Sequence, residues 1–174
     1  MSVQRILRMR VVTMTAVCLA VATLGFTQSE GRTRQTNANR AITARAEIDA
    51  FNKKYIAAHL RMDNAAVLSL WAQDGISLLP ATDPIIGKEA IAKFMDEVVG
   101  RMPGYHMQKM DVDFQGIEVS GDWASEWAEE HQVVQPPPGK RVIDSYGKLL
   151  LVLHREADGN WRVTREMWNQ GLKP

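Results

Sequence analysis

The chain has 174 residues, a length that fits one domain with an appendage. Its 21 basic and 20 acidic residues are dispersed and form no basic stripe, so nucleic acid and other polyanions are not indicated as partners. The single cysteine, Cys18, excludes an intrachain disulfide.

The N-terminal segment has the pattern of an export signal. Residues 1–10 contain three arginines and no acid, and residues 11–26 are apolar apart from three threonines. This pattern predicts a signal peptide over residues 1–26 and a secreted or periplasmic protein. The alternative is a membrane anchor that is not cleaved, since the apolar run is slightly long for a signal although shorter than the roughly 20 residues of a spanning helix.

Cleavage would change the chemistry available to the chain. It would leave 18 basic and 20 acidic residues, a formal charge of −2, and it would remove Cys18. The remaining protein would have no thiol for a nucleophile or a thiolate metal site, and we expect no membrane contact after cleavage.

A polar linker precedes the first predicted helix. Residues 27–42 contain almost nothing to bury, which favours a flexible linker, and the folded domain is expected over residues 43–174. Thr43 is the side chain expected at the helix N-cap. Spacings of three and four then place four residues on one buried stripe of an amphipathic helix: Ile48, Phe51, Tyr55 and His59.

Caps and turn residues predict the next elements. Asp63 is expected to cap a second helix that ends near Trp71, and Asp74 with Gly75 is expected to form a turn. Gly100 is expected to end a third helix. The predicted ranges are a helix over 64–71, a strand over 76–79, a loop over 80–87 and a helix over 88–99.

The second half of the chain predicts four long antiparallel strands, over 105–119, 122–134, 141–155 and 161–169. Alternation shifts phase at Gln115 and Gly116, which indicates a bulge, and Asp158-Gly159 predicts a hairpin turn. The run 149–153 is apolar at every position and needs cover on both faces, from helices or from a second subunit. Helices first and strands afterwards predict an α+β fold, with three helices on one face of a curved sheet.

Several segments, taken in order, carry a family resemblance. They are Leu70-Trp-Ala-Gln-Asp-Gly75, Pro84-Ile-Ile-Gly-Lys-Glu-Ala-Ile91, Ser120-Gly-Asp-Trp-Ala124, Gly147-Lys-Leu-Leu-Leu-Val-Leu153 and Asp158-Gly-Asn-Trp-Arg-Val163. Over about residues 43–171, the chain resembles the SnoaL-like branch of the nuclear transport factor 2-like superfamily. That group includes ketosteroid isomerase, scytalone dehydratase and polyketide cyclases.

The resemblance implies a cone, with helices in the concavity of a bent sheet, a pocket open at one end, and homodimers formed through the outer sheet face. Such cones host enzymes and binding proteins alike. We therefore expect a small apolar, oxygen-bearing ligand, and either cofactor-independent isomerase, dehydratase or cyclase chemistry or a non-catalytic binding or interaction module.

The first helix supplies two candidate catalytic residues, Tyr55 and His59, which should both point at the sheet. In relatives a tyrosine here donates a hydrogen bond to a substrate oxygen, a role suited to a phenol in a pocket of low dielectric constant. The alternative is a core tyrosine beside a buried histidine that has a partner, because an imidazole is costly to bury without one.

Glu126 is the candidate acid of the sheet, because it shares a strand face with two alanines that leave space beside it. Lys148, on the next strand, would hold Glu126 ionised if both faced inward. Without that ion pair, burial would raise the pKa of Glu126 toward values useful for a general base. The alternative is a cross-strand salt bridge without a catalytic role.

Asp74 lies near the position at which ketosteroid isomerase keeps its general base, although an aspartate before a glycine is also ordinary turn chemistry. The second acid of that enzyme, late in the sheet, has no evident counterpart in residues 161–169.

In the strand over 161–169, inward-facing Trp161 and Val163 would turn Arg165 inward unless a bulge intervenes. Arg165 would then clamp a carboxylate or enolate, or pair structurally with an acid.

Other residues are expected to line the pocket. His106 shares the parity of inward-facing residues on its strand. The resemblance to scytalone dehydratase implies a pair of histidines in the pocket, and His59 with His106 is the pair that this chain offers. Glu129 and His131 alone do not make a metal site, and we expect neither a metal nor a cofactor. The candidate ligand-binding residues are Trp71, His106, Met107, Lys148, Met167 and Asn169.

Overall fold

The computed structural model describes residues 35–36 and 39–173 of a chain that divides into two compact units, residues 1–43 and 44–174. In the first unit the described residues are helical, and the Thr43 hydroxyl donates to the Asn39 carbonyl at 3.0 Å. The prediction of an N-cap at Thr43 is therefore wrong, because the residue lies inside a helix. The predicted signal peptide and most of the predicted linker lie outside the described residues.

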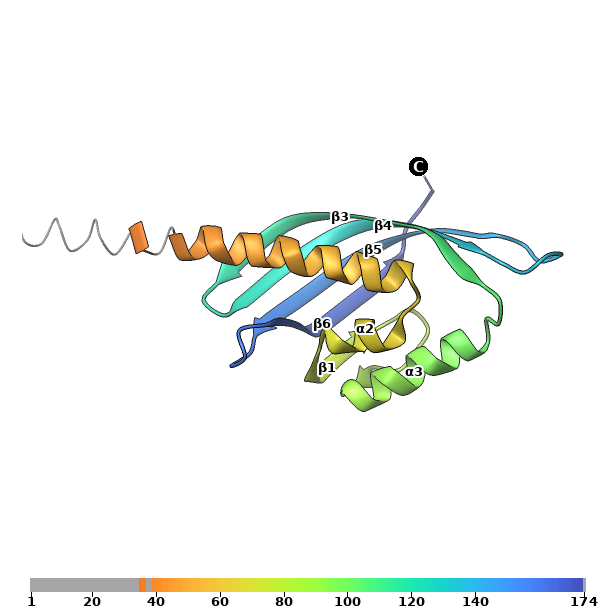
Figure 1. Ribbon diagram of the computed structural model, residues 1–174, viewed down its shortest axis with the longest axis horizontal. Coiled ribbons are helices and arrows are strands. Elements are labelled where there is room, and N and C mark those ends of the chain that lie inside the picture. Colours follow the sequence, from red (N-terminus) through yellow and green to blue (C-terminus); the bar gives the residue numbers. More distant parts are fainter. Residues whose placement is uncertain (1–34, 37–38, 174) are drawn as a thin grey trace, which may run out of the picture. The chain divides into compact units, whose positions relative to one another are not determined.

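The second unit is a mixed α+β structure, as predicted (Figure 1). It begins with a helix that ends at residue 60, here called the N-terminal helix (residues 44–60). The elements that follow are α2 (Asn64–Ser69), β1 (Trp71–Leu78), β2 (Ile85–Ile86), α3 (Lys88–Gly100), β3 (His106–Ser120), β4 (Trp123–Gln135), β5 (Ile143–Arg155) and β6 (Trp161–Gln170). Across the described residues, no helix has the length and apolar character needed to span a membrane.

The strands form one curved sheet in the order β2-β1-β6-β5-β4-β3. All neighbouring pairs are antiparallel except β1 and β6, which run parallel. The N-terminal helix lies across the sheet on the same side as α2 and α3 (Figure 1). The α+β prediction, with helices on one face of a curved sheet, is therefore confirmed.

The first strand is longer than the sequence suggested, and the expected turn at Asp74 is wrong. β1 continues through Asp74 because it pairs with β6, with a register shift between Trp71 and Ile76. Gly75 makes room for the Trp71 indole, since a Cβ there would lie 2.6 Å from the ring. β2, which falls in the predicted loop, pairs with Ile76 and Ser77.

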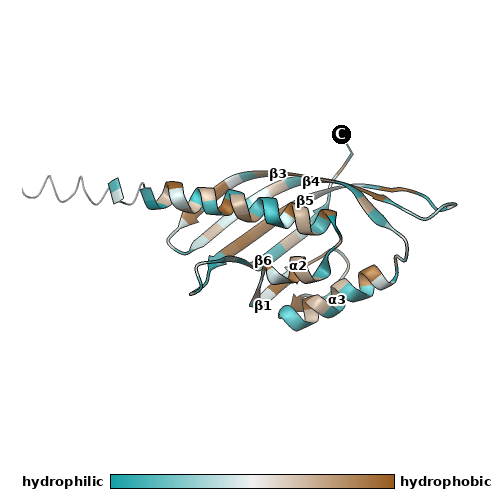
Figure 2. Ribbon diagram, in the orientation of Figure 1, coloured by the Kyte–Doolittle hydropathy of each residue, from teal (hydrophilic) through white to brown (hydrophobic). Residues whose placement is uncertain are grey.

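The core lies between the N-terminal helix and the inner face of the sheet. The predicted stripe is confirmed for Ile48, Phe51 and Tyr55, each at most 5 % exposed. Leu149, Leu151 and Leu153 of β5 are buried beneath the helices. Figure 2 shows brown, apolar stretches in the sheet beside the N-terminal helix.

A bulge in β6 decides which residues of that strand face the helices. Arg165 pairs with Val152, and Val163 pairs with Leu153, so Thr164 is an extra residue without a ladder partner. The Thr164 hydroxyl donates to the Val152 carbonyl at 2.9 Å. One extra residue exchanges the faces of everything that follows it.

Beyond that bulge, Glu166 and Trp168 take the inner positions. Arg165, Met167 and Asn169 are exposed. The expectation that these three residues face the pocket is therefore wrong.

β3 contains two irregularities. The predicted bulge at Gln115 and Gly116 is confirmed by a register shift between Gln115 and Glu118. A second shift, between Met107 and Lys109, was not predicted. It leaves His106 exposed, contrary to the expected parity, whereas Met107 is half-buried.

Candidate functional site

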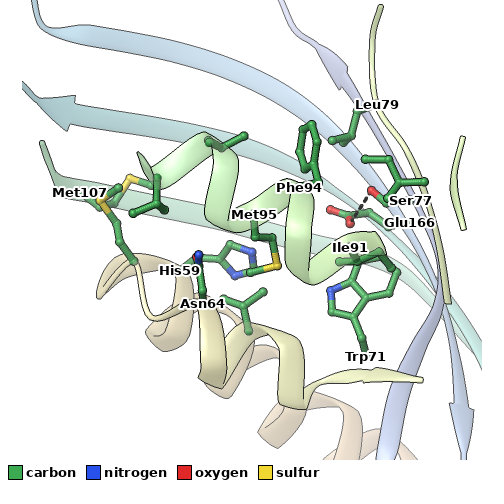
Figure 3. A pocket seen from close by; sticks show the side chains of 15 residues that line it. His59, Asn64, Trp71, Ser77, Leu79, Ile91, Phe94, Met95, Met107 and Glu166 are labelled. Atoms are coloured by element: carbon green, nitrogen blue, oxygen red, sulfur yellow. Dashed lines mark hydrogen bonds between the residues drawn. The ribbon is translucent and has the colours of Figure 1, made fainter. Parts of the chain in front are cut away.

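A pocket of about 220 Å³ lies between the end of the N-terminal helix, α2, α3 and the β1–β2 edge of the sheet. Most of its lining is apolar and includes three methionines, which adapt readily to different shapes. Figure 3 shows the pocket from close by. The lining residues are His59, Met62, Asn64, Val67, Trp71, Ser77, Leu79, Ile85, Ile91, Phe94, Met95, Val98, Val99, Met107 and Glu166.

Glu166 brings a carboxyl group to this apolar wall. The Ser77 hydroxyl donates to Oε2 at 3.2 Å, the dashed contact in Figure 3, and the Tyr55 hydroxyl lies 3.5 Å from Oε1. Burial raises the pKa of Glu166 to about 7, and the negative charge of Glu130 adds to this effect, whereas both hydroxyls oppose it. The β1–β6 pairing sets this geometry, because Ser77 and Glu166 are partners in the parallel ladder.

Tyr55 connects Glu166 to the N-terminal helix. Burial, followed by the charges of Glu166 and Glu130, raises the pKa of the phenol well above its ordinary value. The ring packs against His59, with ring centroids 4.1 Å apart, and edge-on against Phe114. Tyr55 therefore stays protonated near neutral pH and donates its hydrogen to the carboxyl group.

His59 is held in one tautomer by its own helix. Nδ1 lies 2.8 Å from the Tyr55 carbonyl oxygen, and because a carbonyl only accepts, we assign the ring hydrogen to Nδ1. Burial lowers the pKa of His59, so the ring is neutral at pH 7. Its Nε2 atom then carries a free lone pair.

A second buried acid, Glu130, lies outside the pocket lining. It is 4 % exposed and accepts hydrogen bonds from the Trp168 indole at 3.0 Å and from the Gln132 amide. The indole passes over Gly147, the ladder partner of Glu130, where a Cβ atom would overlap the ring. Burial raises the pKa of Glu130. The negative charge of an ionised Glu130 is thus placed where it acts on both Tyr55 and Glu166.

Glu126 is buried, at 1 % exposure, but does not line the pocket. Asn52 donates to Oε2 at 2.8 Å, while Glu126 Oε1 and Asn52 Oδ1 have no partner among the described residues. Burial raises the pKa of Glu126 to about 7. The condition for an ion pair with Lys148 is not met, because Lys148 lies exposed on the other face, opposite Glu129. The alternative, in which burial raises the pKa of Glu126, is the one that the structure supports.

The structure brings only part of the expected set together. His59, Trp71 and Met107 line the pocket, and Tyr55 contacts its carboxyl group. Asp74 is exposed, and its carbonyl oxygen accepts from the Arg165 guanidinium at 3.4 Å. The expected histidine pair does not form, because His106 is exposed while His59 lines the pocket. The predicted site residues absent from the pocket lining are Tyr55, Asp74, His106, Glu126, Lys148, Arg165, Met167 and Asn169.

Sequence reasoning missed five polar residues of the interior: Asn52, Ser77, Glu130, Thr164 and Glu166. Glu166 lies in the last strand, within residues 161–169, and lines the pocket, a role that the sequence analysis did not assign to it. The alternation of the strand alone does not mark Glu166 as inward-facing, because Glu166 and Trp168 become an inner pair only once an extra residue is placed at Thr164. Among the described residues, no group of three His, Cys, Asp or Glu side chains is placed to hold a metal ion.

The chain belongs to the SnoaL-like domain family, whose model matches residues 40–166. Its fold is that of the nuclear transport factor 2-like superfamily, as the resemblance implied. No match was found among curated proteins.

Three solved structures illustrate the fold. A ketosteroid isomerase-like protein from Erwinia carotovora atroseptica is 22 % identical, with a TM-score of 0.63 over 74 % of this chain and 96 % of that chain. A candidate dehydratase of the NTF2-like family from Streptomyces avermitilis is 17 % identical, with a TM-score of 0.65 over 75 % and 99 %. An NTF2-like protein with a cystatin-like fold from Novosphingobium aromaticivorans is 20 % identical, with a TM-score of 0.59 over 78 % and 87 %.

Proposed function

We propose that the pocket beside Glu166 binds a small apolar, oxygen-bearing molecule and that Glu166 moves a proton on that molecule. The reaction class is an isomerisation, dehydration or cyclisation by acid–base chemistry. One observation carries the proposal: a carboxyl group with a pKa of about 7 lines an apolar pocket. A general acid or base works best when its pKa lies near the operating pH.

The neighbours of Glu166 support this role. Ser77 and Tyr55 donate to different oxygens of the carboxyl group, so its orientation is fixed before a ligand enters. A carboxyl group that is already oriented needs little rearrangement during the reaction. The solved structures named as a ketosteroid isomerase-like protein and a candidate dehydratase share the fold, which is consistent with proton-transfer chemistry in this chain.

The exchange of α-hydrogens in 2-tetralone, a compact ketone, tests the proposal. In deuterated buffer near neutral pH, the protein should accelerate loss of the α-proton signal in the proton NMR spectrum. Glu166→Gln should slow the catalysed exchange by about a hundredfold or more, the usual contribution of a general base. Glu129→Gln, which changes an exposed glutamate of β4, should exchange at the wild-type rate. Equal rates in wild type and Glu166→Gln would refute the proposal.

The second candidate is a non-catalytic binding or interaction module with the same pocket. The observation that favours it is that both oxygens of Glu166 already accept hydrogen bonds from protein hydroxyls. In that case 2-tetralone would bind without exchange in any variant.

We also propose export of the protein, on the basis of the predicted signal peptide over residues 1–26. Intact-mass measurement of protein from an exporting host should give a chain that begins between residues 22 and 28. A full-length mass would favour the uncleaved anchor.

A further inference from the structure

We infer that the pocket takes an uncharged, hydroxyl-bearing compound of one or two rings, such as a phenol or a cyclic alcohol. The inference names the ligand class of the proposed function and rests on it. Three features carry it: the size of the pocket, the charges around it, and the hydrogen-bonding atoms in its wall.

The size of the pocket limits the ligand to one or two rings. Its volume is about 220 Å³. An apolar protein cavity of about 150 Å³ holds one benzene molecule. The pocket is about one and a half times that size, which suits a substituted ring or two fused rings better than a four-ring steroid.

The charges around the pocket exclude an anionic ligand. None of the lining residues that the structure describes is a lysine or an arginine. Glu166 lies in the wall, and the nearby Glu130 adds a second acid. A carboxylate or phosphate placed there would lose its hydration without gaining a cation and would be repelled by ionised Glu166.

The hydrogen-bonding atoms of the wall favour a ligand that donates. The lone pair of His59 Nε2 is free because Nδ1 carries the ring hydrogen, and ionised Glu166 is an acceptor only. Figure 3 shows the His59 ring and the Glu166 carboxyl group on either side of Met95. Trp71 also lines the pocket, and its indole N–H is a donor only. A hydroxyl group can donate to His59 and can also accept from an N–H, whereas an ether only accepts.

A matched pair of ligands tests the hydrogen-bonding part. Isothermal titration calorimetry at pH 8, where Glu166 is mostly ionised, would compare indan-5-ol with 5-methoxyindane. We expect indan-5-ol to bind about tenfold more tightly, the value of one hydrogen bond to a free acceptor. Equal affinities, or tighter binding of the ether, would overturn the inference even if the variant below fails to fold.

A variant locates the acceptor. His59→Phe keeps the ring contact with Tyr55 and removes Nε2, so the preference for the hydroxyl should fall to about threefold or less. His106→Phe, a histidine exposed on β3, is the matched control and should keep the full preference. A full preference in folded His59→Phe would overturn the assignment of this acceptor.

Further ligands test size and charge. Estradiol carries a phenol on four rings, and indane-5-carboxylate is the anionic relative of indan-5-ol. Each should bind at least tenfold more weakly than indan-5-ol, and tighter binding of either one of them would overturn the inference.

If the hydroxyl preference fails while 2-tetralone exchange still depends on Glu166, only the ligand class is wrong. If no ligand binds and no exchange occurs, the proposed function fails as well.

Discussion

Two glutamates lie on the inner face of the sheet, and only one of them lines the pocket. Glu166 meets a pocket, and Glu126 meets only the Asn52 amide and the core. Burial raises the pKa of both to about 7. The same physical cause therefore gives one carboxyl group that can act on a ligand and one that can act only on stability.

The stability of the protein should fall as the pH rises through neutrality. A carboxyl group whose folded pKa is raised from 4.5 to about 7 holds a proton that the unfolded chain has already lost. Its stabilisation is therefore fully present below about pH 4.5 and is lost as the pH rises through 7. For Glu126 the effect is on the order of 3 kcal/mol.

Urea unfolding at pH 5 and pH 8 measures this dependence. Glu126→Gln should reduce the difference in the free energy of unfolding between the two pH values, whereas Glu129→Gln should not change it. A wild-type protein more stable at pH 8 than at pH 5 would contradict the assignment.

At the scale of elements, the helix pattern predicted the site better than the strand pattern did. The spacing from Ile48 to His59 placed Tyr55 and His59 correctly. An inserted residue in an α-helix would visibly disturb the spacing of its apolar residues, and no such disturbance occurs here. Asn52, four residues after Ile48, was missed although it continues the buried stripe, since only its partner Glu126 shows why an amide belongs there.

The last strand shows why the other half of the site was not predictable. Arg165 and Glu166 are neighbours, and a single extra residue at Thr164 decides which one faces the ligand. The alternation of apolar and polar residues along β6 does not reveal the extra residue. A bulge is defined by the pairing between two strands, here by the pairing of β6 with Val152 and Leu153 on β5. The volume of the pocket likewise depends on how α3 lies against β1.

The Trp168 indole lies over Gly147 of β5, so a side chain at position 147 should destabilise the protein. A Cβ atom at this position overlaps the ring, so Gly147→Ala should lower the free energy of unfolding by about 1–3 kcal/mol. Gly100→Ala is the matched control, because its Cβ would meet nothing within 4 Å and alanine favours the helix α3. Thermal unfolding of both variants decides the point, and equal melting temperatures would show that the indole does not lie over Gly147.

At the scale of the whole molecule, a row of apolar residues is exposed on the outer face of the sheet. Trp127, Leu150 and Met167 are aligned across β4, β5 and β6, and each is at least 40 % exposed. We propose that a second copy of the chain covers this row, which would supply the second cover expected for residues 149–153.

Leu150→Lys should convert such a dimer to a monomer, since it places a charge at the centre of the row. Leu172→Lys, at a residue 93 % exposed outside the sheet, is the control and should leave the assembly unchanged. Light scattering at micromolar concentration measures both, and a wild-type monomer would remove the proposal.

The central claim is that Glu166 is a carboxyl group that titrates near neutrality inside a ligand pocket. Carbon-13 NMR of protein labelled at the glutamate carboxyl carbons measures this directly, with Glu166→Gln and Glu126→Gln to assign the two signals. We expect a resonance that is lost in Glu166→Gln, that titrates with a pKa of about 7, and that shifts when indan-5-ol is added. A Glu166 signal that titrates near the ordinary value of 4.5, and whose chemical shift does not change when indan-5-ol is added, would contradict the claim.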